Sequence, residues 1–454
     1  MRSDETDTIA AVCTGPGGAL AIVRISGPDA AVCAEKVWCA PGPPLHAEPR
    51  RLRLGHALTP DGESCLAVFM PGPHSYTGED VAELQCHGGS FAPERLLQAV
   101  LDAGARMAEP GEFTRRAFIN GKMDLTQAEA VLDLIRARTA EAANLAERQM
   151  SGSIGSRIRG AAEPLLGVLA EIESRLDFPE EELDWRTPGE LAGLLAPSKK
   201  ILEDLLSGSR AGAVIRDGVR LVIAGIPNAG KSSLLNRVLG YERAIVTDIP
   251  GTTRDTVEET AVIRGIQFRL TDTAGLRTGA MDAAEAFGIA RSKDSLKSAE
   301  LVIWLLDPEK DASAQLREMK SAAAETHAPV IPCWNKRDLI LARHLYAVDP
   351  GTEYAVISAK TGDGMEDLFR LLEKSVRAGM SERESDAAVS QRHEALVKTA
   401  LEQLEAAVPE LHSEDWELAA VRIREAIRAL GTVTGENASP DVLDEIFSRF
   451  CIGK

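Results

Sequence analysis

Apolar runs of strand length dominate the first part of the chain. They alternate with polar positions or stay continuously apolar, and they cover residues 20–25, 65–70 and 81–86. Residues 93–103 have the spacing of a helix instead. The glycines at 15–18 resemble an anion cradle, but a tight turn is favoured because no helix follows them. We therefore predict an α+β or β-rich module over residues 8 to about 118.

Helical spacing takes over from about residue 124 to residue 208 and returns near residue 389. The apolar stripes consist of Ala128, Val131, Leu132 and Ile135, of Leu165, Leu169, Ile172 and Leu176, of Val397, Leu401, Leu404 and Val408, and of Ala420, Ile423, Ile427 and Leu430. The acidic stretch 177–184 is favoured as a solvated loop between helices over a metal site. A last helix is predicted from Ser439 as its N-cap and Pro440 in its first turn.

Continuous apolar runs typical of buried parallel strands lie between the two helical blocks. They cover residues 219–224, 301–306 and 330–334, and further strands are predicted over residues 268–272 and 354–357. The apolar stripe of one helical block needs the other block as its partner, and the ends of a compact insert lie close together. We therefore predict a Ras-like α/β unit with a mostly parallel sheet, inserted into one α-helical domain. The predicted domains are residues 1–118, 119–215, 216–378 and 379–454.

Composition narrows the functional classes. The chain has 69 acidic and 51 basic residues, a formal charge of −18, which argues against a broad phosphate-binding surface. Any RNA would need a local patch or a partner protein. The seven cysteines include no Cys-x-x-Cys pair, so neither a disulfide framework nor a structural zinc site is indicated. Because no window approaches the ~18 apolar residues of a membrane span, we expect a cytoplasmic protein without a membrane segment.

The stretch from Gly225 to Ser232 reads Gly-Ile-Pro-Asn-Ala-Gly-Lys-Ser, the pattern of a phosphate-binding P-loop. It follows a predicted strand and precedes a predicted helix, as that loop requires. Its backbone N–H groups would turn towards phosphates at a helix N-terminus. We expect Lys231 to reach the β- and γ-phosphates and the Ser232 hydroxyl to bind Mg²⁺.

Motifs at the ends of later strands identify the base. The predicted strand 268–272 ends in Asp-Thr-Ala-Gly (272–275), where Asp272 is expected in the magnesium water shell and the Gly275 N–H near the γ-phosphate. Asp338, in the sequence Asn335-Lys336-Arg337-Asp338, would accept hydrogen bonds from N1 and N2 of guanine, which adenine does not offer. A backbone N–H of Ser358-Ala359-Lys360 is expected at guanine O6. The sequence therefore predicts a GTPase.

The switch region leaves the organisation of the attacking water open. Thr253, in the stretch 244–255, is the candidate for the second hydroxyl ligand of Mg²⁺. Leu276 stands where Ras-like enzymes carry a water-orienting Gln, and a leucine offers no hydrogen bond. Candidate replacements are Arg254, Arg277 and Glu285. Asn228 and the backbone around 247–252 also offer oxygens for a monovalent cation near the phosphates.

Further motifs make the chain resemble the MnmE (TrmE) family of tRNA modification GTPases over essentially its whole length. They are Asp7-Thr8-Ile9-Ala10-Ala11, Arg24-Ile25-Ser26-Gly27, Thr77-Gly78-Glu79-Asp80, Glu83-Leu84-Gln85, His87-Gly88-Gly89, the stretches 110–118 and 122–130, and the terminal Phe450-Cys451-Ile452-Gly453-Lys454. The resemblance implies an N-terminal domain that binds 5-formyltetrahydrofolate and dimerises, a discontinuous helical domain, and a G domain whose potassium-dependent dimerisation triggers hydrolysis.

The resemblance also implies partners and a reaction. A homodimer would act with an FAD-dependent MnmG-type protein, in a heterotetramer. Together they would add a (carboxymethyl)aminomethyl group to C5 of the wobble uridine in certain tRNAs.

Residue roles follow from the matching motifs. GTP would be bound by Asn228, Ala229, Gly230, Lys231, Ser232, Ser233, Thr247, Asp248, Ile249, Pro250, Gly251, Thr252, Thr253, Asp272, Thr273, Ala274, Gly275, Asn335, Lys336, Asp338, Ser358, Ala359 and Lys360. The resemblance implies K⁺ on Asn228, Thr247, Ile249 and Thr252, Mg²⁺ on Ser232 and Thr253, catalysis by Glu285, Lys231, Thr253 and Arg254, and folate on Arg24, Glu83, Lys122 and Lys454.

Two assignments keep an alternative. Glu285 is placed by counting back from Gly288-Ile289, and Asp282 is its rival because the spacing from Asp272 is one residue longer than in the family. Cys451 matches the family tail, where it is either a chemically active thiol or a merely tolerated cysteine at a helix end.

Other classes of function remain to be distinguished. The stretch 245–255 also resembles that of ribosome-assembly GTPases, but such proteins usually add a basic RNA-binding domain, and this chain is net acidic. A third possibility is a folate-dependent one-carbon transferase with a regulatory G domain. It requires that the N-terminal module bind folate.

Overall fold

The computed structural model describes residues 7–60, 62–178, 184–241, 259–270, 296–339, 348, 351–378 and 389–454. The chain forms two compact units. The first comprises Met1–Ile135, Arg148–Leu202 and Leu396–Lys454, and the second Arg136–Glu147 and Glu203–Ala395. The predicted domain boundaries remain predictions.

The N-terminal part of the first unit is a seven-stranded sheet of order β3-β4-β5-β6-β2-β1-β7. Its strands are β1 (Ile9–Val12), β2 (Leu20–Ser26), β3 (Trp38–Cys39), β4 (Arg53–Ala57), β5 (Ser64–Met70), β6 (Val81–His87) and β7 (Arg106–Met107). The pairs are antiparallel except β1 with β7. The predicted strands 20–25, 65–70 and 81–86 are confirmed, and the glycines at 15–18 form a turn.

Helices cover one face of this sheet. They are α1 (Ala30–Val37) and α2 (Phe91–Asp102), and α2 confirms the helix predicted over 93–103. Alternation along β2 sends Val23 into the core beneath these helices, while Arg24 points to the opposite face. A short helix η1 (Leu45–Ala47) adds Leu45 to the same core. Arg24 therefore lies on the face of the sheet that α1 and α2 leave uncovered.

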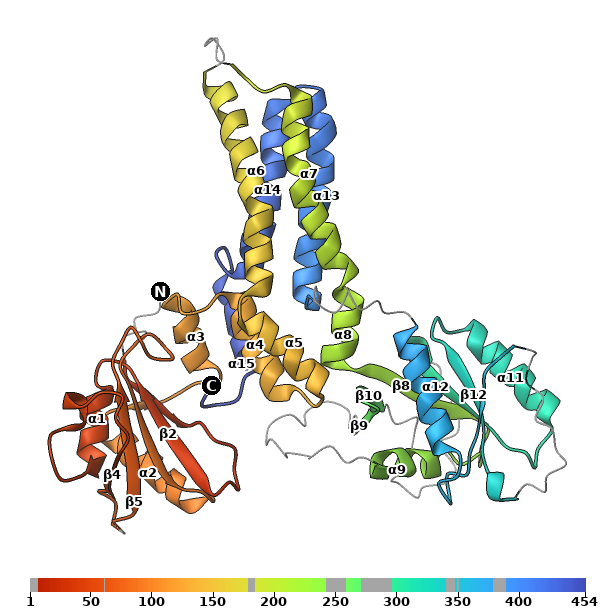
Figure 1. The fold of residues 1–454 in the computed structure, drawn as a ribbon, viewed down its shortest axis with the longest axis horizontal. Helices are drawn as coiled ribbons and strands as arrows, with labels where there is room; N and C mark the ends of the chain where they lie inside the picture. The colour runs from red at the N-terminus through yellow and green to blue at the C-terminus, as the bar shows by residue number, and fades with distance from the viewer. Residues whose placement is uncertain are drawn as a thin grey trace. The chain divides into compact units, whose positions relative to one another are not determined.

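The rest of the first unit is helical, as predicted. Its helices are α3 (Glu112–Ile119), α4 (Leu125–Arg136), α6 (Ser153–Asp177), α7 (Pro188–Ser207), α13 (Gln391–His412), α14 (Trp416–Thr434) and α15 (Pro440–Ser448), except that residues 136, 203–207 and 391–395 belong to the second unit. Figure 1 shows α6 beside α14 and α7 beside α13, and the Lys199 ammonium lies 2.8 Å from the Glu405 carboxylate between the latter two. The predicted cap is confirmed, because the Ser439 hydroxyl accepts a hydrogen bond from the Val442 N–H. Segments far apart in the sequence thus share one helical body.

The second unit contains a six-stranded sheet of order β13-β12-β11-β8-β10-β9. Its strands are β8 (Val219–Gly225), β9 (Glu259–Ile263), β10 (Ile266–Leu270), β11 (Leu301–Leu306), β12 (Val330–Trp334) and β13 (Ala355–Val356). All neighbours are parallel except β9 with β10, so the predicted mostly parallel sheet is confirmed. The accompanying helices are α5 (Ala140–Met150, whose residues up to 147 belong to this unit), α8 (Ser209–Asp217), α9 (Lys231–Tyr241), α11 (Ala312–Ala324) and α12 (Met365–Arg377), with the short helix η2 (Arg337–Leu339).

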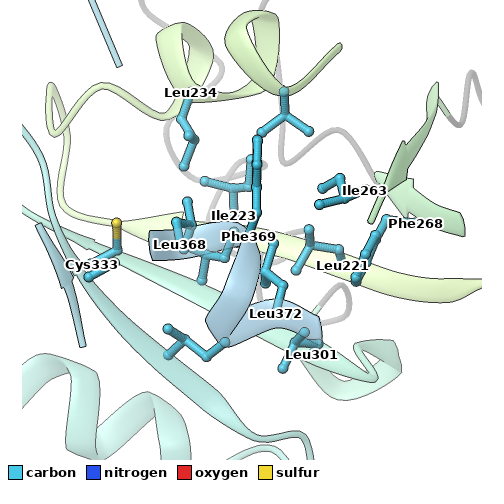
Figure 2. Packing of buried hydrophobic residues seen from close by; sticks show 14 of the residues in the cluster. Leu221, Ile223, Leu234, Ile263, Phe268, Leu301, Cys333, Leu368, Phe369 and Leu372 are labelled. Atoms are coloured by element: carbon cyan, nitrogen blue, oxygen red, sulfur yellow. The ribbon is translucent and has the colours of Figure 1, made fainter. Parts of the chain in front are cut away.

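Helices α9 and α12 pack on one face of this sheet. Figure 2 shows Leu234 of α9 and Phe369 of α12 against strand residues Ile223 and Phe268. The other face carries Trp304, Leu306 and Trp334 against Met319 of α11, besides partly buried apolar residues. Because both faces of the sheet are covered here, β11 is apolar along its whole length and all of it is buried. The carboxyl ends of β8, β11 and β12 then meet at one edge of the sheet.

The described residues contain no helix that is both long and apolar enough to cross a membrane. The same residues bring no group of three His, Cys, Asp or Glu side chains together in a way that suits a metal ion.

Candidate nucleotide-binding site

The loop from Gly225 to Gly230 joins β8 to α9 at the carboxyl edge of the sheet, as predicted. Gly225 has a φ of 136°, and a Cβ there would lie 2.3 Å from the Leu305 carbonyl oxygen. At Gly230 the φ is 100°, and a Cβ would lie 2.2 Å from the Asn335 amide nitrogen. Both glycines are therefore required by the close approach of neighbouring strands and loops.

Between these glycines the loop turns through Asn228, which has a left-handed φ of 65° and an exposed side chain. Asparagine tolerates this conformation better than most residues. Its side-chain oxygen is thus presented to solvent at the turn of the loop.

Lys231 begins α9, and its ammonium bends back over the loop. It donates to the carbonyl oxygens of Gly225 and Ile226, at 2.9 Å each. Burial lowers the pKa of this lysine. Ser232 beside it is partly buried and Ser233 is exposed. A cation held over a glycine-rich loop at a helix N-terminus is an arrangement suited to phosphate.

Asn335, which follows β12, ties the P-loop to the loop after β13. Its amide nitrogen donates to the Ala229 carbonyl at 2.7 Å, and its oxygen accepts the Ala359 N–H at 2.9 Å. Its exposed fraction is 3%. The predicted groups 228–233, 335–338 and 358–360 are thus brought to one edge of the sheet. The predicted contact of this backbone with guanine O6 stays a prediction.

Asp338 is oriented by the same loop. The Ser358 hydroxyl donates to its carboxylate at 2.6 Å, and this bond, with the nearby Lys360 and Lys336 charges, lowers the Asp338 pKa. Arg237 of α9 supports the loop from the other side, donating to the Ala359 and Lys360 carbonyls. Asp338 is therefore an exposed, ionised hydrogen-bond acceptor held in a fixed direction.

Several predicted residues lie outside the described residues. They are Thr247, Asp248, Ile249, Pro250, Gly251, Thr252, Thr253, Arg254, Asp272, Thr273, Ala274, Gly275, Leu276, Arg277, Asp282 and Glu285.

A second group of predicted residues gathers in the first unit. Arg24 of β2 bonds Glu83 of β6 at 2.9 Å, and its guanidinium lies over the rings of Tyr76 and Phe113, at 5.1 and 5.7 Å from their centroids. The two charged residues face each other because their strands pair in this register. The structure thus gives Arg24 and Glu83 the ion pair that their apolar surroundings require.

The C-terminal tail lies against this sheet. The Lys454 carbonyl accepts the Phe113 N–H at 3.2 Å, and the Cys451 carbonyl accepts the Gly111 N–H at 3.4 Å. Burial raises the pKa of the Cys13 thiol, on which the charges of Arg24 and Lys454 act in the opposite direction. Arg24, Glu83 and Lys454 are therefore close enough to share one electrostatic environment.

Lys122 contacts a different element. Its ammonium donates to the Pro73 carbonyl at 2.9 Å, and its Cγ would lie 3.3 Å from a Cβ at Gly78. It therefore borders the 72–80 loop. Tyr76 in that loop makes the cation–π contact with the Arg24 guanidinium.

Comparison with known proteins covers the whole chain. The family described as GTP-binding protein TrmE N-terminus matches residues 8–122, and the family described as MnmE helical domain matches residues 125–451. The chain is 44% identical over 464 residues to the tRNA modification GTPase MnmE of Symbiobacterium thermophilum, with 99% of each chain covered. The chain belongs to the MnmE family of tRNA modification GTPases.

Other relatives agree. The tRNA modification GTPase MnmE of Chloroflexus aurantiacus is 42% identical over 457 residues, which are 99% of this chain and 100% of that protein. The protein of the same name in Geobacter metallireducens is 40% identical over 457 residues, 99% of each chain. The MnmE-family resemblance seen in the sequence motifs is thereby confirmed.

One buried acid in this MnmE-family chain was missed by sequence reasoning. Asp307 follows the wholly apolar strand β11 and is buried. It lies 2.7 Å from the Lys336 ammonium. The sequence feature that could have indicated this site is an aspartate directly after a predicted buried strand. The carboxyl ends of such parallel strands lie at the same edge of the sheet as the P-loop.

Proposed function

We propose that this chain is a GTPase that acts with an FAD-dependent MnmG-type protein on tRNA. In this proposal the complex adds a (carboxymethyl)aminomethyl group to C5 of the wobble uridine, with a formyltetrahydrofolate-type donor of the one-carbon unit. The observation that carries the proposal is identity of 44% across 99% of a relative named tRNA modification GTPase MnmE. The geometry of the nucleotide edge supports the GTPase part.

GTP is proposed to lie along the edge formed by the P-loop and the loops after β12 and β13. The P-loop backbone and Lys231 would hold the phosphates, while Asp338 would accept hydrogen bonds from the guanine edge. The fit is supported by the ionised Asp338 and by the Lys231 ammonium above the loop carbonyls. These residues bind and orient the nucleotide.

Mg²⁺ and K⁺ are proposed beside the phosphates. Ser232 and Thr253 would bind Mg²⁺, which neutralises charge on the phosphate oxygens. K⁺ would take oxygens of Asn228, Thr247, Ile249 and Thr252. The exposed Asn228 side chain at the turn of the P-loop suits this role, because amide oxygens are suitable ligands for such a hard cation.

Hydrolysis tests the cation proposal directly. We expect GTP turnover by the full chain to rise strongly when K⁺ replaces Na⁺, and Asn228→Ala to remove the rise. Equal rates in both salts would contradict a potassium site. Exchange of ATP for GTP is the control, since Asp338 should exclude adenine.

The water-orienting residue has its own test. Glu285→Ala is expected to lower kcat with GTP affinity nearly unchanged, because Glu285 is proposed to act on water through a bridging water. Asp282→Ala is the matched variant. If Asp282→Ala lowers kcat and Glu285→Ala does not, Asp282 and not Glu285 is the residue that orients the attacking water.

The proposed folate-binding residues are Arg24, Glu83, Lys122 and Lys454. The cations suit the anionic glutamate tail of folate, and a carboxylate suits the donor edge of its pterin. The environment shared by Arg24, Glu83 and Lys454 supports this. Titration of the full chain with 5-formyltetrahydrofolate tests it, and no binding at high micromolar concentration would contradict the role.

The physiological role has a cellular test. The proposal expects a cytoplasmic homodimer that joins the MnmG-type protein in a heterotetramer, so cells lacking this chain should lose the wobble-uridine modification. Mass spectrometry of tRNA nucleosides measures it, with wild-type and Lys231→Ala proteins as complementing controls. Unchanged nucleosides together with a defect in ribosomal subunits would favour the ribosome-assembly alternative.

A further inference from the structure

Asp307 is a buried carboxylate at the carboxyl end of the central strand β11. That strand lies between β8, which leads into the P-loop, and β12, which leads into Asn335 and Lys336. The ladder continues past the strand ends, because the Asn335 N–H donates to the Leu306 carbonyl at 3.0 Å. Asp307 therefore enters the nucleotide edge beside residues 335–338.

Both oxygens of this carboxylate have partners. One accepts the Glu309 N–H at 3.0 Å, and the other accepts the Lys336 ammonium at 2.7 Å. Only 1% of the Asp307 side chain is exposed. A carboxylate so buried is costly unless it is paired and hydrogen-bonded, and Lys336 supplies the pairing charge.

The backbone of Asp307 is fixed as well. The Gln315 side chain of α11 accepts the Asp307 N–H and donates to the Asp307 carbonyl, at 2.8 Å each. Gln315 is itself 3% exposed. These two hydrogen bonds satisfy the backbone N–H and carbonyl of Asp307 beyond the end of β11. They hold the residue, and with it the carboxylate, in one orientation.

Lys336 is thereby restrained at both ends. Its backbone has a left-handed φ of 61°, and its ammonium is held by Asp307 and, at 2.9 Å, by Glu309. The two carboxylates differ in exposure, 1% for Asp307 and 58% for Glu309. Solvent screens the exposed pair, so Asp307 dominates the position of the lysine.

We propose that Asp307 is a positioning residue of the guanine-nucleotide site and acts through Lys336. The inference rests on the proposed GTP site. The salt bridge fixes the lysine side chain over the nucleotide edge before the nucleotide arrives, so little side-chain entropy is lost on binding. Without the carboxylate, the ammonium samples solvent and bound nucleotide leaves faster.

The experiment measures release of a fluorescent GDP analogue, mant-GDP, from the full chain in stopped flow. Asp307→Asn keeps the shape and removes the charge, and it is expected to speed release about tenfold, or about 1.4 kcal/mol. Turnover at saturating GTP is expected within about twofold of wild type, with a raised KM, because ground-state binding is lost. Glu309→Gln is the matched control, expected within about twofold throughout.

A double-mutant cycle separates positioning from general damage. Lys336→Gln alone is also expected to speed release about tenfold and to lower the thermal unfolding midpoint, because it leaves the Asp307 charge buried and unpaired. Adding Asp307→Asn to Lys336→Gln should add no further release rate and should raise the midpoint again. Additive release rates would overturn the proposal, since Asp307 would then act by another route.

Further outcomes are decisive. Release at the wild-type rate from Asp307→Asn overturns the inference and leaves the proposed function intact. A wild-type chain that binds no mant-GDP contradicts the proposed function, and the inference with it. If Asp307→Asn does not fold, Lys336→Gln still tests the pair, and wild-type release with an unchanged midpoint overturns it.

Discussion

Asn335 serves as a connector between loops. Sequence reasoning assigned it to the nucleotide because it opens the Asn-Lys-Arg-Asp motif. In the structure, both ends of its amide are bonded to backbone, to Ala229 in the P-loop and to Ala359 in the loop after β13. An amide suits this position because it donates at one end and accepts at the other. A buried residue of this kind sets how the phosphate-binding and base-binding loops lie relative to each other.

Replacing Asn335 should therefore damage stability and binding together. Asn335→Ala leaves the Ala229 carbonyl and the Ala359 N–H buried without their partner, a cost of about 2–4 kcal/mol in unfolding free energy. Denaturant unfolding of the full chain measures it, and mant-GDP affinity should fall in the same variant. Asn335→Asp keeps the acceptor for Ala359 but places a buried carboxylate oxygen against the Ala229 carbonyl, so it should destabilise the chain at least as much. Equal stability of Asn335→Ala and wild type would contradict the connecting role.

At the scale of elements, a charged network joins α3 to the start of β1 and to β7. Arg116 of α3, with 6% of its side chain exposed, bonds Asp7 at 2.6 Å and Glu112 at 3.1 Å. Arg106 of β7 bonds the same two carboxylates, at 2.7 Å each. Glu79, in the loop before β6, adds a bond to Arg116 at 3.2 Å. The buried Arg116 and the partly exposed Arg106 are thus each shared by carboxylates from separate elements, which fixes α3 on the sheet.

This network predicts a loss of stability in acid. Burial alone would raise the Glu112 pKa, but bonds from Arg106 and from the Glu109 N–H outweigh it and leave the pKa lowered. A lowered folded-state pKa contributes stability above the unfolded value of about 4.3, and the contribution disappears as pH falls through the folded value. Glu112→Gln should cost about 2 kcal/mol at pH 7. Denaturant unfolding from pH 7 to pH 3 should show the difference from wild type shrinking in acid; a constant difference would contradict this.

At the scale of the molecule, the C-terminal tail of the first unit packs against the N-terminal part of the same unit. The tail beyond α15 reaches the first strand of the sheet, and Gly453 has a φ of 97° with room for no side chain. A Cβ there would lie 2.3 Å from the Val12 carbonyl oxygen. Arg115 of α3 pairs with Asp444 of α15 at 3.0 Å, next to the tail. The end of the chain therefore completes the surface around Arg24.

Displacing the tail should weaken the proposed folate site and spare the G domain. Gly453→Ala introduces both a strained φ and a clash with the Val12 carbonyl, so the C-terminal tail should be displaced from β1. We expect 5-formyltetrahydrofolate affinity to fall about tenfold by calorimetry, or about 1.4 kcal/mol, with GTP turnover within about twofold of wild type. Ile452→Ala is the control, because that side chain is 54% exposed. Unchanged affinity in Gly453→Ala would show that the tail does not form the site.

Features that depend on near neighbours could be predicted from the amino-acid sequence. The P-loop lies within eight consecutive residues, Gly225 to Ser232, so its glycines, lysine and flanking strand and helix were all readable in order. The run 301–306 was readable as a buried strand because a sheet covered on both faces needs apolar residues throughout. The Ser439 cap of α15 was likewise local. Such features express backbone propensity and short-range hydrogen bonding.

The contacts that connect these features arise only when the chain is folded. Asn335 and its partner Ala229 are 106 positions apart, and the acceptor of the Phe113 N–H is the last residue of the chain. Asp307 belongs to no recognisable sequence motif. Its role follows from the pairing of β11 with β12, which places its carboxylate beside the Lys336 ammonium. Periodicity shows which residues are buried but carries no information on which distant group compensates a buried charge. That compensation depends on strand order and register, which the folded sheet alone fixes.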